Sequence, residues 1–581
     1  MNVKIDLSKF TILMAIITSL LVSPLFLFPF GNIKFIFFIF VMFILTILLA
    51  FNFKNLVENQ SKVPLLVSLI FGTTLLINLF TTEQPYITPL IGSSASKNGL
   101  LAHLGFLLTF LIMVYGKSNK VEIFLFKSLS CLGLFFAVYG IAQYFGFDVA
   151  RLQTGDKSSQ LYGSGTGVFL TLGNTNYASL VFVITIISTI FILTSLNLNK
   201  ILKLILIIST LSQLVLIFLI GDTLGAVIVL FSIFLILKIM IKKIKVYQNY
   251  LSKIWWVLFG TGTIFGALGI FGFGFFEKIL YKESFVDRLY TWKIGLDIVR
   301  DNLFFGIGLD SFVSGYALYR TDESVIYRRK NYDSYADNAH NFLIQYFATG
   351  GILVFTAYCL YLFLILYCAL KTIKSGHNVT TINWLFIVWF AIQLYTFVGV
   401  SNIVIQIWGW IISGVLVKHS LSYLPISKSN NSIKSKYRTI IKFCFLTLRL
   451  GLISSSIWLL FFSINYAALD LAFVSARKDL LISRNNTPEF NLNNIYNSAR
   501  NIPSLDHKIL AARILANSGM EREALELGNQ SIEMYPHLLP GWDFIATIYE
   551  QSGRKELSLF YRQQTIKLDP LNPRFKELLR S

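Results

Sequence analysis

The sequence predicts an all-α protein: a polytopic membrane bundle of about 12–13 spanning helices, followed by an external tetratricopeptide-like helical domain. Three observations predict this class. The mean hydropathy is +0.64 and 55% of the 581 residues are hydrophobic, which is too apolar for a soluble globular chain. Apolar stretches long enough to span a bilayer recur from Phe10 to Tyr466. Beyond Tyr466 the chain becomes balanced in charge and helix-forming.

Apolar stretches of about 17 to 25 residues are expected to form the membrane-spanning helices. They lie near residues 10–29, 34–53, 64–80, 100–115, 123–145, 177–196, 201–220, 223–240, 254–275, 342–370, 382–400, 403–421 and 443–465. The first is flanked by Lys4 and Lys9 and lacks a small-residue cleavage site. We therefore expect it to be retained rather than removed as a signal peptide.

The distribution of the net charge of +20 indicates the orientation of the chain in the membrane rather than a binding patch. When the loops are assigned alternately to the two sides, one set carries 21 Lys or Arg against 3 Asp or Glu. The positive-inside rule places this set and the N-terminus in the cytoplasm, and the other loops and the tail outside. The expected location is the cytoplasmic (inner) membrane, and the expected partners include membrane lipids and no nucleic acid.

Three segments on the external side are long and rich in Gly, Asn and aromatic residues, at roughly 81–99, 146–176 and 277–340. Long loops that converge above a helical bundle are where a site is expected. We therefore predict a transmembrane domain over residues 1–465, which contains the large external loop 277–340, and an external helical tail over 466–581.

The tail contains an internal repeat. A shift of 34 residues aligns identical residues at Ala512 and Ala546, Ile514 and Ile548, Ser518 and Ser552, Gly519 and Gly553, Leu525 and Leu559, Ile532 and Ile566, and Pro536 and Pro570. This period is typical of tetratricopeptide repeats, here at about 507–540 and 541–574. Two interpretations stay open: a stabilising cap on the external face, or a groove for a protein partner.

The large external loop begins with a predicted amphipathic helix that carries Arg288 near its start. Gly306 and Gly308 then end this helix and permit close backbone approach. The basic cluster 328–330 follows, and the loop closes with DNAHN, residues 337–341, before the next span.

His340 is the best candidate for chemistry in the chain. We expect Asp337 or Asn338 to cap the following helix, so that His340 is not needed for capping. A histidine at a membrane surface exchanges protons near neutral pH. Together with Arg288 it can also bind a polyisoprenyl pyrophosphate and stabilise the leaving group. The alternatives are a structural histidine and an interfacial anchor arginine.

Other polar positions allow two interpretations each. Asn174 and Asn176 either bind sugar hydroxyls or satisfy the backbone of a turn. Asp222 lies between two closely spaced spans and is either ligand-related or part of an exposed turn. The four cysteines, which lie in or beside apolar spans without metal-ligand spacing, are expected to be packing residues: Cys131, Cys359, Cys368 and Cys444.

These motifs together resemble the O-antigen ligase and polymerase superfamily. The matching strings are TLGNTN at 171–176, RLYTW at 288–292, FFGIGLDSF at 304–312 and DNAHNFLIQYFATGGIL at 337–353. IGSSASKNGLL at 91–101 is similar to the first external loop of the family, with Lys97 where an arginine is common. The likeness covers roughly residues 60–465 and implies a GT-C-like membrane fold. Members with tetratricopeptide tails resemble bacterial O-oligosaccharyltransferases.

The resemblance implies transfer of a glycan from a polyprenyl-pyrophosphate carrier to a lipid or protein acceptor, without metal or cofactor. It makes His340 and Arg288 the catalytic residues. The substrate-binding candidates are Asn338, Asn341, Asn174, Asn176, Lys97, Arg151 and Arg328. This sequence departs from the family at one string: Thr223, Leu224 and Gly225 stand where many members have Ser-Arg-Gly. If that arginine normally binds the carrier, either Lys97, Arg151 or Arg328 must substitute for it, or the activity is altered or absent.

Two other functions remain as alternatives. A polymerase would join repeat units with the same donor chemistry and a carrier-linked acceptor. A non-enzymatic transporter of lipid-linked glycans, or an envelope scaffold, belongs to another class. Transporters tend to place charged residues inside their spans, whereas here the charges gather in loops. The tail favours delivery to a protein acceptor.

Overall fold

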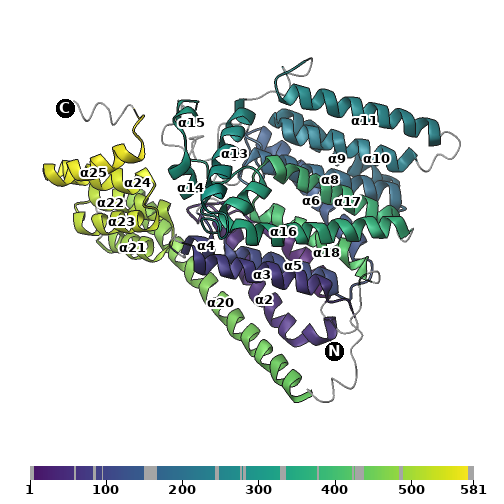
Figure 1. Ribbon diagram of the computed structural model, residues 1–581, viewed down its shortest axis with the longest axis horizontal. Helices are drawn as coiled ribbons and strands as arrows, with labels where there is room; N and C mark the ends of the chain where they lie inside the picture. Colours follow the sequence, from purple (N-terminus) through teal and green to yellow (C-terminus); the bar gives the residue numbers. More distant parts are fainter. Residues whose placement is uncertain are drawn as a thin grey trace.

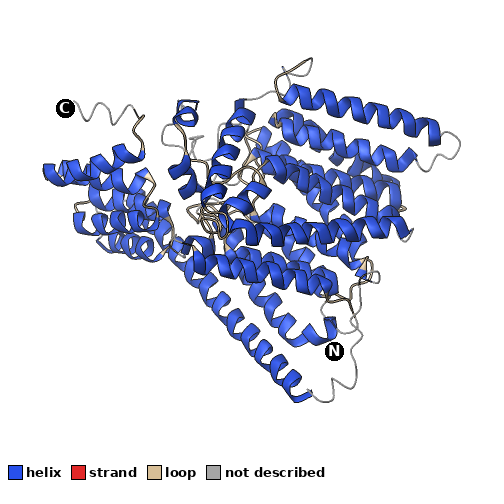
Figure 2. Cartoon of the chain, viewed as in Figure 1, coloured by secondary structure: helices blue, strands red, loops and turns tan. Residues whose placement is uncertain are grey.

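The computed structural model describes residues 6–57, 60–82, 85, 87–93, 96–148, 167–241, 248–274, 278, 283–327, 335–375, 379–421, 424, 438–482 and 489–572. Within these ranges every regular element is a helix, as Figure 2 shows. The predicted all-helical fold class is thereby confirmed.

The structure contains a bundle of long apolar helices that lie side by side (Figure 1). In the described residues, nine helices include a stretch long and apolar enough to cross a membrane. They are α2 (Asn32–Val57), α3 (Val63–Thr81), α6 (Val121–Tyr144), α8 (Thr175–Ser195), α9 (Lys200–Ile220), α10 (Thr223–Ile241), α16 (Phe342–Ser375), α17 (Val379–Val398) and α20 (Arg438–Ile482). Three shorter apolar helices join them: α1 (Leu7–Leu20), α5 (Leu100–Tyr115) and α18 (Ile403–Lys418). The helix α11 (Gln248–Ile270) occupies the remaining predicted position.

The predicted first span, 10–29, is too long. The helix α1 ends at Leu20, and the segment after it forms turns in which Ser23 donates its backbone N–H to the carbonyl of Pro29. Pro24 and Pro29 lack the backbone N–H that a helix requires, which accounts for the early end.

The centre of the bundle is packed around aromatic side chains. Trp410 of α18 stacks on Tyr361, with ring centroids 4.2 Å apart, and Phe106 of α5 lies on another side of the same indole. Small residues let the backbones approach closely, since a Cβ at Gly414 would lie 2.8 Å from the carbonyl oxygen of Phe110.

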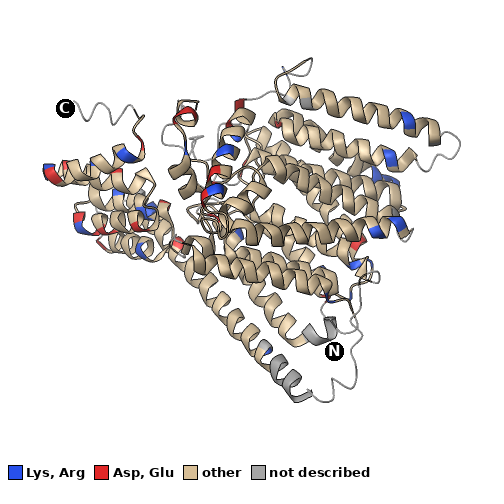
Figure 3. Ribbon diagram, viewed as in Figure 1, with Lys and Arg blue, Asp and Glu red and all other residues tan. Residues whose placement is uncertain are grey.

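The two ends of the bundle differ in charge. One end, which we call the loop end, carries α4 (Ile87–Ile91), α13 (Glu283–Asp301), α14 (Phe312–Tyr319), α15 (Asp322–Tyr327) and the tail. Among the described residues, charged residues of both signs occur there, whereas mostly Lys and Arg gather at the opposite end (Figure 3). The charge asymmetry seen in the sequence therefore corresponds to two physical ends of the molecule.

A break in α16 connects this helix to the large loop. Gly351 has φ 66° and ψ −173°, which is not helical. The interrupted turn is bonded by the loop between α13 and α14, because Ile307 and Gly308 donate their backbone N–H groups to the carbonyls of Ala348 and Thr349. At Gly306 a Cβ would lie 2.5 Å from the carbonyl carbon of Thr349, so only glycine fits there.

Asn78, in the last turn of α3, completes this junction. Its amide nitrogen donates to the carbonyls of Phe305, at 2.6 Å, and Thr349, at 3.0 Å. Its amide oxygen accepts the backbone N–H of Leu309 at 2.9 Å. One buried side chain thus joins α3, the glycine loop and the broken helix.

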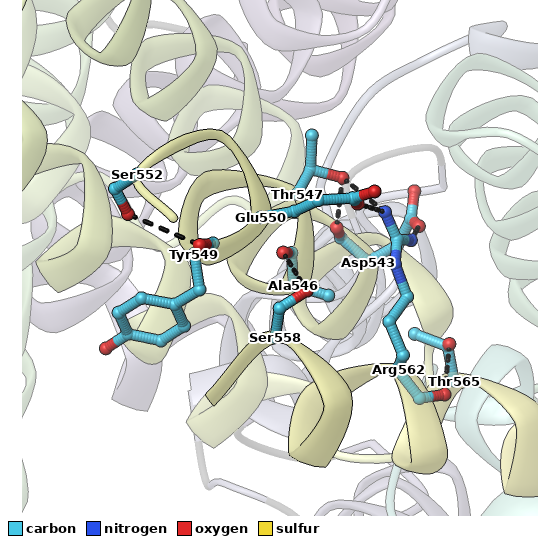
Figure 4. A network of polar contacts seen from close by, with 9 residues as sticks. All are labelled: Asp543, Ala546, Thr547, Tyr549, Glu550, Ser552, Ser558, Arg562 and Thr565. Atoms are coloured by element: carbon cyan, nitrogen blue, oxygen red, sulfur yellow. Dashed lines mark hydrogen bonds and ion pairs between the residues drawn. The ribbon is translucent and has the colours of Figure 1, made fainter. Parts of the chain in front are cut away.

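The tail is continuous with the bundle through α20, which runs across the predicted boundary at Tyr466. Five helices follow: α21 (Glu489–Asn501), α22 (Leu505–Asn517), α23 (Glu521–Met534), α24 (Leu539–Gln551) and α25 (Lys555–Leu568). The bounds of α22 and α23 recur 34 residues later in α24 and α25. Figure 4 shows how the last pair is joined: Arg562 of α25 reaches Asp543, at 2.5 Å, and Glu550, at 2.8 Å, both on α24.

Buried polar contacts dock the tail on the loop end. Asp470 of α20 accepts the backbone N–H of Leu27 and faces His507 of α22, each at 3.1 Å. Arg320, at the end of α14, lies 3.3 Å from the carboxylate of Asp569 beyond α25. The Arg320 and Asp569 side chains are only 7% and 1% exposed, so this ion pair is shielded from water.

We predict that Asn78→Leu destabilises the protein by about 3 kcal/mol, because buried carbonyl and N–H groups lose their partner. The free energy of unfolding, measured by denaturant titration in detergent micelles, checks this. The control Asn197→Leu replaces an exposed loop asparagine and is expected to change stability by about 0.5 kcal/mol or less. Equal effects of the two substitutions would contradict the role of Asn78.

Arg320→Met is expected to loosen the end of the tail, because it removes the cation from a buried carboxylate at a cost of about 3 kcal/mol. Hydrogen exchange of the α25 amides should speed up by about 100-fold. Arg554→Met is the matched control: Arg554 pairs with Glu521 at 3.4 Å, but both side chains are well exposed. Its effect should stay below about 1 kcal/mol. Unchanged exchange in the Arg320 variant would refute the docking role.

Candidate functional site

A pocket at the loop end is built by three segments that are distant in sequence. They are the start of α5 with the loop before it, the large loop with the start of α16, and the connection from α17 to α18. Its polar lining consists of Ser96, Asn98, His103, Asp310, Asn338, His340, Asn341, Gln345, Tyr346, Thr349, Thr396, Ser401 and Gln406. Among the described residues that line it there is no Lys or Arg, so the pocket is rich in neutral hydrogen-bonding groups.

The start of α16 is capped by Asn341, which corrects the expectation of a cap at Asp337 or Asn338. The Asn341 side-chain oxygen accepts the backbone N–H groups of Leu343, at 2.9 Å, and Ile344, at 3.1 Å. Helix α16 begins only at Phe342, so the DNAHN string lies wholly before it. The capping residue therefore directly follows His340, whereas the expected caps lie two and three residues before His340.

His340 is held in a strained backbone conformation at the edge of the pocket. Its φ is 50°, in the left-handed region that a histidine seldom adopts. The backbone N–H of His340 donates to the side-chain oxygen of Asn338 at 2.9 Å, and Ala339 donates to Gln345 at 2.8 Å. These contacts fix the turn and place the half-buried imidazole on the pocket wall.

Asp310 organises the opposite side of the pocket. Its carboxylate accepts the backbone N–H groups of Ser93, at 2.7 Å, and Asn98, at 3.1 Å, and the hydroxyl of Ser96. The first external loop is thereby wrapped around a residue of the large loop. Burial raises the pKa of Asp310, and these hydrogen bonds act in the opposite direction.

Asp337 titrates in an unusual range. Burial, followed by the nearby charge of Asp310, raises the pKa of Asp337 to about 6. Its carboxylate accepts a hydrogen bond from the amide of Asn338 at 2.8 Å. A carboxyl group with this pKa changes charge near physiological pH, three residues before His340.

Arg288 does not line the pocket. It lies in the first half of α13, on a helix whose buried face is formed by Thr291, Ile294, Gly295, Ile298 and Val299. Burial lowers the pKa of the Arg288 guanidinium, while Tyr395 and Asp222 act to raise it. Arg288 therefore lies within electrostatic reach of α17 and of the turn between α9 and α10, beside the pocket rather than in it.

The string from Thr223 to Gly225, in which the arginine expected from the family resemblance is absent, forms the start of α10, directly after the turn that follows α9. Asp222 accepts the backbone N–H groups of Leu224 and Gly225, each at 3.1 Å, and so caps α10. It is half-buried rather than part of an exposed turn, and burial raises its pKa while Arg288 opposes this. The cation that acts on Asp222 is thus supplied by α13.

Asn174 and Asn176 lie at the start of α8 and not in the pocket lining. The Asn174 side chain accepts the backbone N–H of Asn176 at 2.8 Å and caps the helix, as the turn interpretation proposed. Leu170 and Thr171, a few residues before Asn174, are held by side chains of the bundle. Gln143 hydrogen-bonds both the backbone N–H and the carbonyl of Leu170, and the Lys34 ammonium donates to the carbonyl of Thr171 at 2.6 Å.

Of the three proposed substitute cations, Lys97 alone lies among the described residues. The ammonium of Lys97 is buried and donates to the hydroxyl of Tyr466 on α20 at 3.1 Å, so it points away from the pocket. Arg151 and Arg328 lie outside the described residues. Among the described residues, no group of three or more His, Cys, Asp or Glu side chains is placed to hold a metal ion.

Sequence reasoning missed His103 and Tyr346, which face each other in the pocket. Both lie in stretches read only as apolar spans, His103 on α5 and Tyr346 on α16. The signal that could have found them is a histidine and a tyrosine one turn inside a span, next to the motif strings.

Fold and pocket define a polytopic helical membrane protein whose site is formed by its longest loops and the helices below them. Residues 161–359, about a third of the chain, match a family model described as O-antigen ligase. The match includes Arg288, the glycine loop and His340. Over this region the chain is similar to O-antigen ligases, and its long apolar helices support a multi-pass membrane protein. A comparison with curated proteins finds no match.

Asp337→Asn is expected to stabilise the protein relative to wild type as pH rises. Because the folded-state pKa of Asp337 is raised to about 6 from 3.8, its neutral form is favoured on folding. The stability it contributes is complete below about pH 4 and is lost as pH rises through about 6. The difference in unfolding midpoint should grow over this window and then level off. Asp479→Asn, at an exposed position, controls for net charge; a pH-independent difference would contradict the expectation.

Proposed function

We propose that the protein transfers a glycan from a polyprenyl-pyrophosphate carrier to an acceptor hydroxyl at the external face of the cytoplasmic membrane. The observation that carries the proposal is the pocket itself: His340 stands in a neutral, amide-rich recess at the loop end. The family to which this region is similar supports glycan transfer. Neutral hydroxyl and amide groups are suited to binding sugar hydroxyls, and so is a carboxylate.

In the proposed reaction, the acceptor oxygen forms a bond with the anomeric carbon of the donor glycan. The bond from that carbon to the pyrophosphate oxygen breaks, and the carrier pyrophosphate leaves with the electron pair. His340 takes the hydroxyl proton as general base. Arg288 neutralises the charge that builds on the leaving pyrophosphate. The step requires no metal, so transfer should persist in EDTA.

The positions of His340 and Arg288 support separate roles for the two residues. The pocket lining includes His340 but no cation among its described residues, whereas Arg288 lies beside the pocket near Asp222. We place the acceptor in the pocket and the pyrophosphate near Arg288. Asn338 and Asn341 then bind sugar hydroxyls at the border between the acceptor and the pyrophosphate. They do so through the side-chain amide groups that their contacts to the backbone do not use.

Orientation and acceptor class belong to the same proposal. Among the described residues, mostly Lys and Arg gather at the opposite end of the bundle, and by the positive-inside rule this supports an external position for the loop end and the tail. The tail, as a tetratricopeptide-like domain of two repeats over 466–581, offers a surface for a protein partner. This favours an oligosaccharyltransferase or ligase over a polymerase.

The test is reconstitution in liposomes with a polyprenyl-pyrophosphate glycan and three acceptors: a serine-rich peptide, a lipid-linked core oligosaccharide and a second carrier-linked glycan. His340→Asn should lower the rate of transfer by about 100-fold or more. Asparagine tolerates the left-handed backbone at this position, so the loss will not report strain. Arg288→Gln should lower the rate by about 100-fold.

Arg300→Gln is the matched control, because Arg300 lies on the same helix but is exposed and pairs with Asp297 at 3.1 Å. Its rate should equal that of wild type. Equal rates in all variants would refute the catalytic assignment. Product only with the second carrier-linked glycan would identify a polymerase, and movement of glycan across the bilayer without bond formation would identify a transporter.

A further inference from the structure

His103 and Tyr346 form a hydrogen-bonded pair in the wall of the pocket. The Nε2 atom of His103 lies 2.8 Å from the hydroxyl of Tyr346, and both residues line the pocket together with His340. The two side chains are almost fully buried, at 5% and 6% exposed. A buried polar pair that faces a site calls for a functional explanation.

The direction of this hydrogen bond follows from the other nitrogen of the ring. The Nδ1 atom of His103 lies 2.9 Å from the carbonyl oxygen of Gly99, which can only accept. The Nδ1 atom therefore carries the proton, and in the neutral ring Nε2 is an acceptor. Tyr346 must then donate its hydroxyl proton to His103, and its oxygen lone pairs remain available toward the pocket.

The carboxylate of the pocket and most of its amide oxygens are already engaged by groups of the protein. Asp310 accepts three hydrogen bonds from the first external loop. The amide oxygens of Asn338, Asn341 and Gln345 each accept a backbone N–H. The amide oxygen of Gln406 accepts the indole N–H of Trp410 at 3.2 Å. These groups shape the pocket, and their commitment leaves few acceptors for a substrate.

Asn98 supplies a second available acceptor. Its amide nitrogen donates to the carbonyl of Ser401 at 3.3 Å, while its amide oxygen is buried without a hydrogen-bond partner. A buried unpaired oxygen is costly unless a ligand satisfies it. Tyr346 and Asn98 thus present two acceptor oxygens to the same recess, which is suited to groups that donate hydrogen bonds.

We propose that Tyr346 and Asn98 form a subsite for the hydrogen-bond donors of the acceptor that lie next to its reacting hydroxyl, and that His103 positions Tyr346. The subsite accepts hydrogen bonds from a neutral polyol or from a peptide that carries the reacting hydroxyl, and it disfavours phosphate, which would place its own acceptors against these oxygens. His340 then takes the proton of the reacting hydroxyl, which the bound neighbouring donors orient. This inference rests on the proposed glycan transfer and assigns its acceptor side.

Tyr346→Phe tests the subsite with little disturbance, because the ring keeps its stacking on Tyr358 at 4.2 Å. In the reconstituted assay with the same three acceptors, kcat/KM for the acceptor should fall by about tenfold, the equivalent of one hydrogen bond. The KM for the carrier-linked donor should stay unchanged. Tyr358→Phe is the control, since Tyr358 packs beside Tyr346 but does not line the pocket, and it should behave as wild type.

His103 is tested by rescue and by coupling. His103→Gln retains an oxygen that can accept from Tyr346 and should keep most of the activity, whereas His103→Leu should lose about tenfold in kcat/KM for the acceptor. The double variant of His103→Leu and Tyr346→Phe should be no worse than either single variant, because the pair acts as a unit.

Two outcomes overturn the inference separately from the proposed function. If wild type transfers glycan and Tyr346→Phe matches it in both KM and kcat, the subsite is wrong and glycan transfer stands. If the loss appears in the donor KM instead, the pocket binds the carrier glycan and the assignment is reversed. If wild type yields no product with any of the three acceptors, both proposals fall together.

Discussion

The interrupted turn of α16 is the constraint on which the rest of the loop end depends. A helix that breaks within an apolar bundle exposes carbonyl groups that lipid cannot satisfy. Here the loop after α13 donates its N–H groups to Ala348 and Thr349, and Asn78 of α3 adds a side-chain donor to the latter. The break therefore exists only together with a loop of fixed shape. That loop continues directly into Asp310, so the same contacts that repair the helix also place the carboxylate around which the pocket forms.

Backbone strain is concentrated around this junction. Outside glycine, positive φ angles in the described residues include those of Lys97, Asp310 and His340, which come from the first external loop, the large loop and the end of DNAHN. Such conformations persist only where surrounding contacts determine them. Three loops that each contain one such residue meet at one site. The strain is thus distributed over the segments that must converge, and it is held by side-chain to backbone hydrogen bonds such as those made by Asp310 and Asn338.

The tail is part of the same structure rather than an appendage. Arg320 contacts Asp569 beyond α25 and also lies over the ring of Tyr335, 4.9 Å from its centroid. Tyr335 stands two residues before Asp337, so a single guanidinium bridges the end of the tail and the approach to His340. Thr88 of α4 adds a hydroxyl contact to Tyr535 at 3.2 Å. Under the proposed function, an acceptor protein bound by the tail would therefore be held against the loops that form the pocket.

The sequence by itself determined the helical class, the placement of most spans and the two charged ends, and it singled out the DNAHN string that borders the pocket and the glycine loop that contacts α16. These depend on composition, periodicity and local turn chemistry, which are properties of neighbouring residues. It could not determine that Asn341 rather than Asp337 or Asn338 caps α16, that Lys97 turns away to Tyr466, or that His103 and Tyr346 face the pocket. Those outcomes were decided by the tertiary structure, because each depends on which distant backbone or side-chain group arrives to satisfy a buried polar atom, and residues 243 positions apart become partners only when the helices pack.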